Sequence, residues 1–258
     1  MSLQSCADIV AKGDPDRFAA TMAAPVEARR VLFPIYAFNV EIARAPWVTE
    51  EPMIAEMRLQ WWRDALDEIG QGGPVRKHDV TTSLADVLVA EDAAILDKLV
   101  QARRWDIYKG GFEDEKHLSE YLDATGGGLM WVVARALGAD KFRATPENSA
   151  EDVVRRFGRA TAFVRFMQAA AELVARGRKP LAVSGEDEIA ALARFHSIEA
   201  APEMLLRRCL ITEARPALIE GWQTHPLLRQ IIRDPARVAN GCVGLSPFRK
   251  KLRLLRWS

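Results

Sequence analysis

The sequence has few residues of the types that build disulfides and transition-metal sites. Its 258 residues include three cysteines and four histidines, all scattered along the chain, and no two cysteines form a CxxC pair. An odd number of widely spaced cysteines is typical of free thiols in a reducing compartment. Because a zinc site needs closely spaced ligands, this distribution favours neither a disulfide framework nor a zinc centre.

The sequence also lacks long apolar runs and a one-sided charge. No apolar stretch reaches the roughly 18 residues that a membrane-spanning helix needs, and the N-terminus shows no secretory signal. The 36 basic and 35 acidic residues leave a net charge of +1, which does not indicate nucleic-acid binding. We therefore expect a cytoplasmic protein with no nucleic-acid partner, which contacts the inner membrane peripherally if it contacts a membrane.

Strand-like alternation, internal repeats and low-complexity linkers are missing as well. Helical periodicity takes their place, as in the segment from Pro52 to Ile69, which ends in a cluster of glycines and a proline at 70–74. A chain with 49% apolar residues can bury a large core. The sequence predicts an all-α fold of about ten to twelve helices, with residues 1–258 forming a single domain.

The longest predicted helix runs from Glu151 to Pro180, with Gly177 near its end. We expect its inner face to be apolar and to consist of Phe157, Phe163, Val164, Phe166, Met167, Leu173 and Val174. A stripe along this helix carries one cation and no carboxylate, and consists of Ala162, Arg165, Ala169 and Leu173.

Three consecutive glycines, Gly126 to Gly128, lie before another predicted helix. They predict either a flexible loop or a place where two backbones approach closely. A phosphate-binding loop is disfavoured, because no strand precedes the glycines and no Lys-Ser/Thr pair follows them.

The C-terminal tail, residues 248–258, is basic and amphipathic. It combines five cations with several apolar side chains and contains no acid. Such a helix can bind an anionic membrane surface or an acidic partner. The alternative, which we take as the default, is a helix that packs Leu252, Leu255 and Trp257 on the core and leaves its cations in solvent.

Several motifs resemble the squalene and phytoene synthase family. Ile35-Tyr36-Ala37-Phe38, followed by Trp62-Arg63, resembles its first conserved region, and Phe157-Gly158 to Gly177-Arg178 resembles its second. The resemblance covers most of residues 18–181 and implies an isoprenoid synthase-like helical bundle around a central cavity. By this resemblance, the candidates for lining a ligand pocket are Tyr36, Asn39, Arg44, Tyr121, Ala162, Arg165 and Phe166.

Family members that couple prenyl diphosphates carry an Asp-rich motif on each of two helices, whose carboxylates hold Mg²⁺ against the diphosphate. In this sequence the outer aspartate positions of the two motifs fall on Ala43, Trp47, Ala169 and Leu173. None of these side chains supplies an oxygen ligand, and the neighbouring arginines would repel a cation. We therefore predict no catalytic residues, no metal site and no cofactor.

Two arginines near these positions, Arg44 and Arg165, have two interpretations. They can form ion pairs inside the former reaction cavity, with Glu41, Asp106 or Glu172 as partners. Alternatively, they can hold an anionic group such as a phosphate without a metal. We expect the internal pairing.

The runs Tyr36–Ala43 and Glu56–Trp62 resemble more closely the branch of the family that includes a mitochondrial complex I assembly factor. This resemblance implies a non-catalytic assembly or interaction factor, with respiratory complex I subunits or other assembly factors as partners and a lipid or isoprenoid as a candidate ligand. One alternative is a Mg²⁺-dependent prenyltransferase that couples two prenyl diphosphates through displaced acids. Another is a scaffold whose cavity is filled by Trp47, Phe166 and Leu173.

Overall fold

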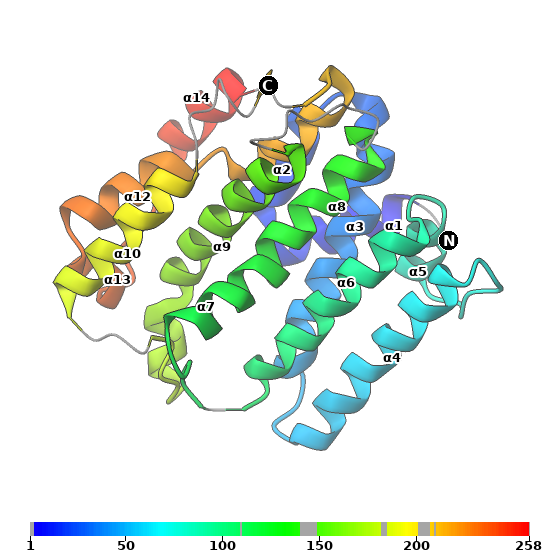
Figure 1. Ribbon diagram of the computed structural model, residues 1–258, viewed down its shortest axis with the longest axis horizontal. Helices are drawn as coiled ribbons and strands as arrows, with labels where there is room; N and C mark the ends of the chain where they lie inside the picture. Colours follow the sequence, from blue (N-terminus) through cyan, green and yellow to red (C-terminus); the bar gives the residue numbers. More distant parts are fainter. Residues whose placement is uncertain are drawn as a thin grey trace.

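The computed structural model describes residues 3–108, 110–139, 149–181, 185–200, 207–208 and 210–257. Within these ranges the chain forms helices and no strand, which confirms the all-α prediction (Figure 1). The α-helices are α1 (Leu3–Gly13), α2 (Pro15–Ala23), α3 (Val26–Arg44), α4 (Pro52–Gly70), α5 (Asp79–Ala85), α6 (Ala90–Ala102), α7 (Glu115–Leu122), α8 (Gly128–Ala136), α9 (Ala150–Ala175), α10 (Glu186–Glu199), α12 (Thr224–Arg233), α13 (Ala236–Ala239) and α14 (Pro247–Trp257). Shorter 3₁₀ or π segments are η1 (Ala45–Trp47), η2 (Arg103–Asp106), η3 (Asp123–Gly127) and η5 (Thr212–Gly221).

Helix α9 runs through the middle of the molecule, between the α7–α8 run on one side and α10 and α12 on the other (Figure 1). The Ser149 hydroxyl accepts a hydrogen bond from the Asp152 N–H at 3.0 Å and caps its first turn. The helix ends earlier than predicted, because Gly177 takes a φ of +76°, which a glycine adopts without strain. The predicted inner face is buried from Phe157 to Leu173, but Val174 is 59% exposed and does not belong to it.

The three glycines lie inside a helix, since α7, η3 and α8 form one uninterrupted helical run with a π-helical turn at Asp123–Gly127. A Cβ added to Gly158 of α9 would lie 2.6 Å from the Gly126 carbonyl oxygen and 2.8 Å from the Gly127 Cα. A Cβ carbon in a folded protein does not lie this close to another non-bonded heavy atom, so the two helices approach closely because both carry glycine. Of the two alternatives, the structure shows the close approach.

Helix α3 is buried along most of its length and continues through Pro34 to Arg44 without a break. Phe38 packs against Trp62 of α4, with ring centroids 5.5 Å apart in an edge-to-face arrangement. This packing fixes the rotation of α3 about its axis. Asn39 and Ala43, one helical turn apart, then lie on the same side of the helix.

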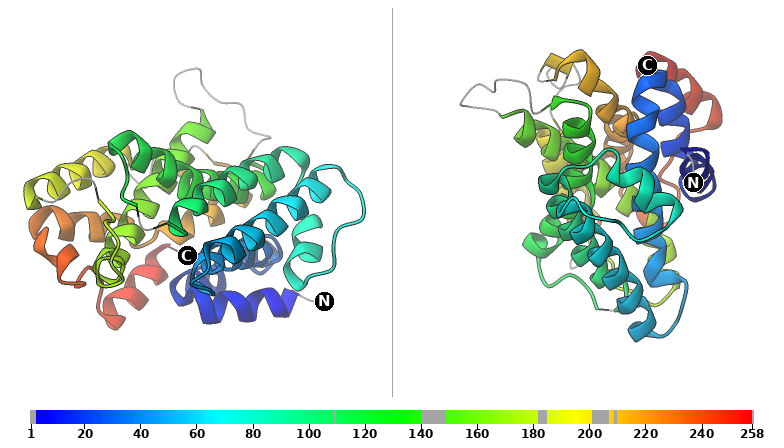
Figure 2. Two further views of the ribbon diagram at one scale, coloured as in Figure 1. Left: turned by 90° about the horizontal axis from the view of Figure 1, so that it is seen from below. Right: turned by 90° about the vertical axis from the view of Figure 1, so that its right-hand side faces the viewer.

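The C-terminal part departs most from the sequence prediction. The sequence predicts a helix from Pro202 to Leu218, with a kink at Pro216. Residues 201–206 and 209 lie outside the described ranges, and Thr212–Gly221 forms a 3₁₀ helix with Pro216 inside it. Helix α14 returns to the N-terminal part and packs against α2 (Figure 2). Among the described residues, we find no helix with the length and hydropathy needed to cross a bilayer.

Candidate functional site

A cavity of about 270 Å³ lies between the N-terminal helices and α9. The four positions that the resemblance assigns to metal-binding aspartates meet there, because Ala43 and Trp47 come from α3 and η1, and Ala169 and Leu173 from α9. The full lining consists of Asp14, Arg17, Asn39, Ala43, Trp47, Arg103, Asp106, Tyr121, Leu122, Thr125, Gly126, Gly158, Thr161, Ala162, Arg165, Phe166, Ala169, Leu173 and Glu220. Trp47, Phe166 and Leu173 therefore line the cavity without filling it.

Most of the predicted pocket residues line this cavity, namely Asn39, Tyr121, Ala162, Arg165 and Phe166. Tyr36 and Arg44 do not. Tyr36 is fully buried behind the cavity wall, with the Arg17 guanidinium 5.0 Å above its ring. Arg44 follows Ala43 by one residue, which turns it about 100° around the helix. Its side chain is 63% exposed and pairs with Glu41 at 3.5 Å, outside the cavity.

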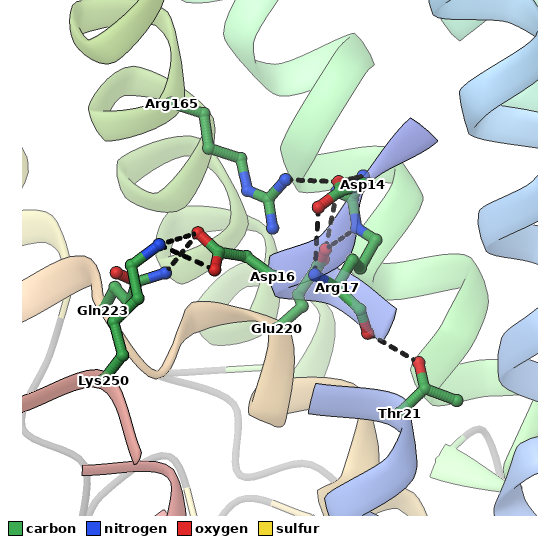
Figure 3. Close-up of polar contacts among 8 residues, drawn as sticks. All are labelled: Asp14, Asp16, Arg17, Thr21, Arg165, Glu220, Gln223 and Lys250. Atoms are coloured by element: carbon green, nitrogen blue, oxygen red, sulfur yellow. Dashed lines mark hydrogen bonds and ion pairs between the residues drawn. The ribbon is translucent and has the colours of Figure 1, made fainter. Parts of the chain in front are cut away.

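One polar group of the cavity joins Asp14 and Arg17 at the start of α2, Arg165 of α9 and Glu220 of η5 (Figure 3). Arg17 donates from Nε to Glu220 Oε2 at 2.6 Å, and its Nη1 lies 3.1 Å from Asp14 Oδ2. Arg165 reaches the same Asp14 Oδ2 at 2.6 Å. Asp14 also caps α2 by accepting the Arg17 N–H at 2.9 Å. One carboxylate thus holds two guanidinium groups and a helix start in place.

These contacts shift the protonation equilibria of the cluster. Burial raises the pKa of Asp14, but the charges of Arg165 and Arg17 outweigh it and hold the pKa at about 2. Burial lowers the pKa of Arg17, but Glu220 and Asp14 raise it above its usual value. Burial, and next the Glu220 carboxylate, raise the pKa of the Tyr36 hydroxyl. At neutral pH Asp14 and Arg17 are therefore charged and Tyr36 is neutral.

A second polar group lies in the cavity wall formed by η2 and α7. Asp106 is bound by Arg103 Nη1 at 3.0 Å and by the Tyr121 hydroxyl at 3.1 Å. Burial raises the pKa of Tyr121, and although Arg103 opposes this, Asp106 adds to it. Arg178, just after α9, donates to the carbonyl oxygens of Asp106 and Tyr108 and lies with its guanidinium 4.5 Å from the Trp47 ring centroid. These contacts connect the rim of the cavity to its polar wall.

The residues present do not fit a magnesium site. Among the described residues lining the cavity, three carboxylates face three arginines, and each carboxylate binds an arginine at 3.1 Å or less. Glu172, the remaining acid near the second motif, points into solvent and pairs with Arg176 at 2.7 Å. A hard divalent cation would have to displace a guanidinium from a charge-assisted pair to gain even one oxygen ligand.

Among the described residues that line the cavity, two buried side-chain polar atoms have no hydrogen-bond partner, Asn39 Oδ1 and Arg103 Nε. Asn39 is 5% exposed, lines the cavity, and its Oδ1 has no hydrogen-bond partner among the described residues. Buried amide oxygens are normally satisfied, so this atom marks where a ligand donor or a water would bind. Trp47, Phe166 and Leu173 supply apolar surface in the same cavity. The combination suits a small ligand with one polar and one apolar end.

Sequence reasoning missed four charged residues of the site, which are Asp14, Arg17, Arg103 and Glu220. The pair Asp14-Pro15 is a local signal for a helix start, and Asp14 is the N-cap of α2. The contact of Asp14 with Arg165 leaves no local pattern in the sequence. Arg165 was expected to pair inside the cavity, and it does, but with a carboxylate that was not among the three considered. Arg17 and Glu220 are 203 residues apart, and no spacing rule connects them.

Comparison with known proteins gives a family match over nearly the whole chain. Residues 10–257 match the family model for squalene/phytoene synthase. Two solved structures superpose well at 15% sequence identity. A dehydrosqualene synthase in complex with ligand gives a TM-score of 0.75 over 99% of this chain and 94% of that one. Squalene synthase HpnC from Alicyclobacillus acidocaldarius gives 0.67 over 91% and 94%. The predicted isoprenoid synthase-like fold is thereby confirmed.

The relatives found by sequence similarity are complex I assembly factors, whereas the two solved structures are synthases. The chain is 30% identical over 146 residues to the complex I assembly factor 6 homolog of Drosophila melanogaster, covering 54% of this chain and 43% of that protein. It is 24% identical over 151 residues to human complex I assembly factor 6, covering 54% and 42%. The match thus spans less than half the length of these relatives. The resemblance to this branch, inferred from the helix motifs, is confirmed.

Proposed function

Because this chain belongs to the squalene/phytoene synthase family, we propose that it is a non-catalytic member that acts as an assembly or interaction factor for NADH dehydrogenase, respiratory complex I. Its partners are then complex I subunits or other assembly factors. It works at the cytoplasmic face of the inner membrane, where such subunits are accessible. The names of the sequence relatives support this assignment.

The observation that carries the proposal is the pairing of Arg165 with Asp14 and of Arg17 with Glu220 in the lining of the cavity. A metal-dependent prenyl transfer needs free carboxylates to hold Mg²⁺ against the leaving diphosphate. Here the motif positions Ala43 and Ala169 offer no oxygen, and the carboxylates nearby are neutralised by guanidinium groups. The cavity keeps the shape of a binding site without the ligands for that chemistry.

We extend the proposal to a small amphipathic ligand, a lipid or an isoprenoid, bound in the cavity. Asn39 Oδ1 would accept a hydrogen bond from the polar group of the ligand, and Trp47 and Phe166 would contact the apolar part of the ligand. Native mass spectrometry of the gently purified chain would show the bound molecule. Ala43→Phe, which narrows the cavity, would release it. Spectra showing only bare protein for both chains would reject the ligand.

The assembly role is tested by capture from the native membrane fraction. The affinity-tagged full chain is mixed with detergent-solubilised membranes, and NADH dehydrogenase subunits are quantified by mass spectrometry against an unrelated tagged protein. We expect enrichment of these subunits. We also expect that cells lacking the gene lose NADH oxidation by their membranes and keep succinate oxidation. No enrichment together with unchanged NADH oxidation would contradict the proposal.

A further inference from the structure

Helix α14 is fixed to the body of the protein by one of its faces. Trp257 is 4% exposed and stacks on Phe157, with ring centroids 6.0 Å apart and planes 7° from parallel. Lys250 Nζ lies 2.8 Å from Asp16 of α2 (Figure 3), and Arg253 donates to the Trp222 carbonyl oxygen. These contacts orient the helix and determine which residues face away from the protein.

The opposite face of α14 presents an apolar stripe to solvent. Phe248 is 74% exposed, Leu252 41% and Leu255 76%. Their i, i+4, i+7 spacing places them along one line, and Trp257 lies about 180° around the helix from Phe248. The default expectation from the sequence, that Leu252 and Leu255 pack on the core, is therefore wrong. Only Trp257 of that set does so.

Basic side chains flank the stripe on both sides. Lys251 lies about 70° to one side of it, and Arg256 and Arg249 lie about 70–90° to the other. All three are exposed, and α14 contains no acidic residue. The other two cations of the helix, Lys250 and Arg253, point toward the protein. We call the exposed side, which carries the apolar stripe and the three exposed cations, the outer face of α14.

We propose that the outer face of α14 docks the protein on an anionic lipid surface. The stripe lies on a convex helix, so its apolar side chains can enter the boundary between headgroups and acyl chains while the flanking cations contact lipid phosphates. A protein partner fits less well, because the centres of protein interfaces are depleted in lysine and charge. The inference depends on α14 alone, so a negative result for lipid binding would leave the proposed role in complex I assembly untouched, and the reverse also holds.

The test is sedimentation of the full chain with lipid vesicles. We expect binding to vesicles of phosphatidylcholine mixed with phosphatidylglycerol, little binding to phosphatidylcholine alone, and weaker binding at high salt. Phe248→Ser/Leu252→Ser/Leu255→Ser and Arg249→Gln/Lys251→Gln/Arg256→Gln should each weaken partitioning by about tenfold or more. Circular dichroism should show both folded, since exposed positions tolerate substitution.

Matched controls remove similar side chains elsewhere. Phe195→Ser/Ile198→Ser deletes two exposed apolar side chains of α10. Lys12→Gln/Lys77→Gln/Lys98→Gln removes three exposed cations far from α14 in the sequence. Both controls should bind like the wild type. The proposal would be overturned if the α14 variants bound as well as the wild type, or if the wild type did not bind anionic vesicles. If the chain captured an acidic protein without binding vesicles, the stripe would be assigned to that partner instead.

Discussion

Arg165 shows how one residue changes what the cavity can bind. Its guanidinium lies 2.6 Å from Asp14, and it is permanently charged, so this pair persists across the physiological pH range. The acids around the cavity are held by arginine in the same way on two sides, at Glu220 and at Asp106. Guanidinium groups therefore stabilise a polar cavity that has no metal ligands at its motif positions.

One buried histidine, His196, makes a contribution to the stability of the fold that depends on pH. His196 of α10 is 3% exposed and stacks on Phe163 at 4.3 Å. Burial, and next the charge of Arg159, lower its pKa from 6.5 to about 4. The folded state therefore holds this histidine neutral, while the unfolded state takes up a proton below its ordinary pKa. Its contribution to stability is fully present above about pH 6.5 and is lost as the pH falls toward 4.

The size of this effect can be measured. We expect the free energy of unfolding to fall by about 3 kcal/mol between pH 7 and 4 on account of His196. His196→Phe, which keeps a ring against Phe163, should remove that part of the decline. Urea denaturation of both chains at several pH values measures the difference. An equally steep decline in the variant would show that other groups determine the acid sensitivity.

At the scale of helices, the contact between η3 and α9 limits what the fold tolerates. Gly158→Ala would force the two backbones apart, because the new methyl group would lie 2.6 Å from the Gly126 carbonyl oxygen. We expect a loss of about 1–3 kcal/mol, the usual cost of overpacking a core. Gly73→Ala is the control, since nothing lies within 4 Å of its Cβ position. Equal midpoints of thermal unfolding for both variants would contradict the close approach.

Helices with local start and stop signals could be predicted from the sequence, and those governed by tertiary contacts could not. Helix α4 begins at Pro52 and ends at Gly70 as expected, because both signals are local. The 3₁₀ helix around Pro216 and the outward face of α14 depend on what packs against them. Leu255 has the same local pattern whether it faces the core or solvent, and the contacts of Trp257, Lys250 and Arg253 with the rest of the protein decide which.

At the scale of the whole molecule, the family resemblance predicted that residues far apart in the sequence lie at one cavity, which residue spacing alone could not predict. Ala43 and Ala169 are far apart in the sequence, yet both line the cavity, as expected if the two motifs face a common chamber. The carboxylates that complete the site, Asp14 and Glu220, come from segments outside both motifs, so no motif could have named them. The fold class and the meeting of the two motifs at one cavity were therefore predictable, whereas most of the charged residues of the site were not.

The measurement that tests the central claim most directly is release of diphosphate from farnesyl diphosphate by the purified chain, with and without Mg²⁺. A squalene synthase assayed in parallel serves as the positive control. Because the motif positions carry no oxygen ligand and the nearby carboxylates are bound to arginine, we predict no release above the protein-free background at any Mg²⁺ concentration. Mg²⁺-dependent release accompanied by a coupled prenyl product would contradict the account.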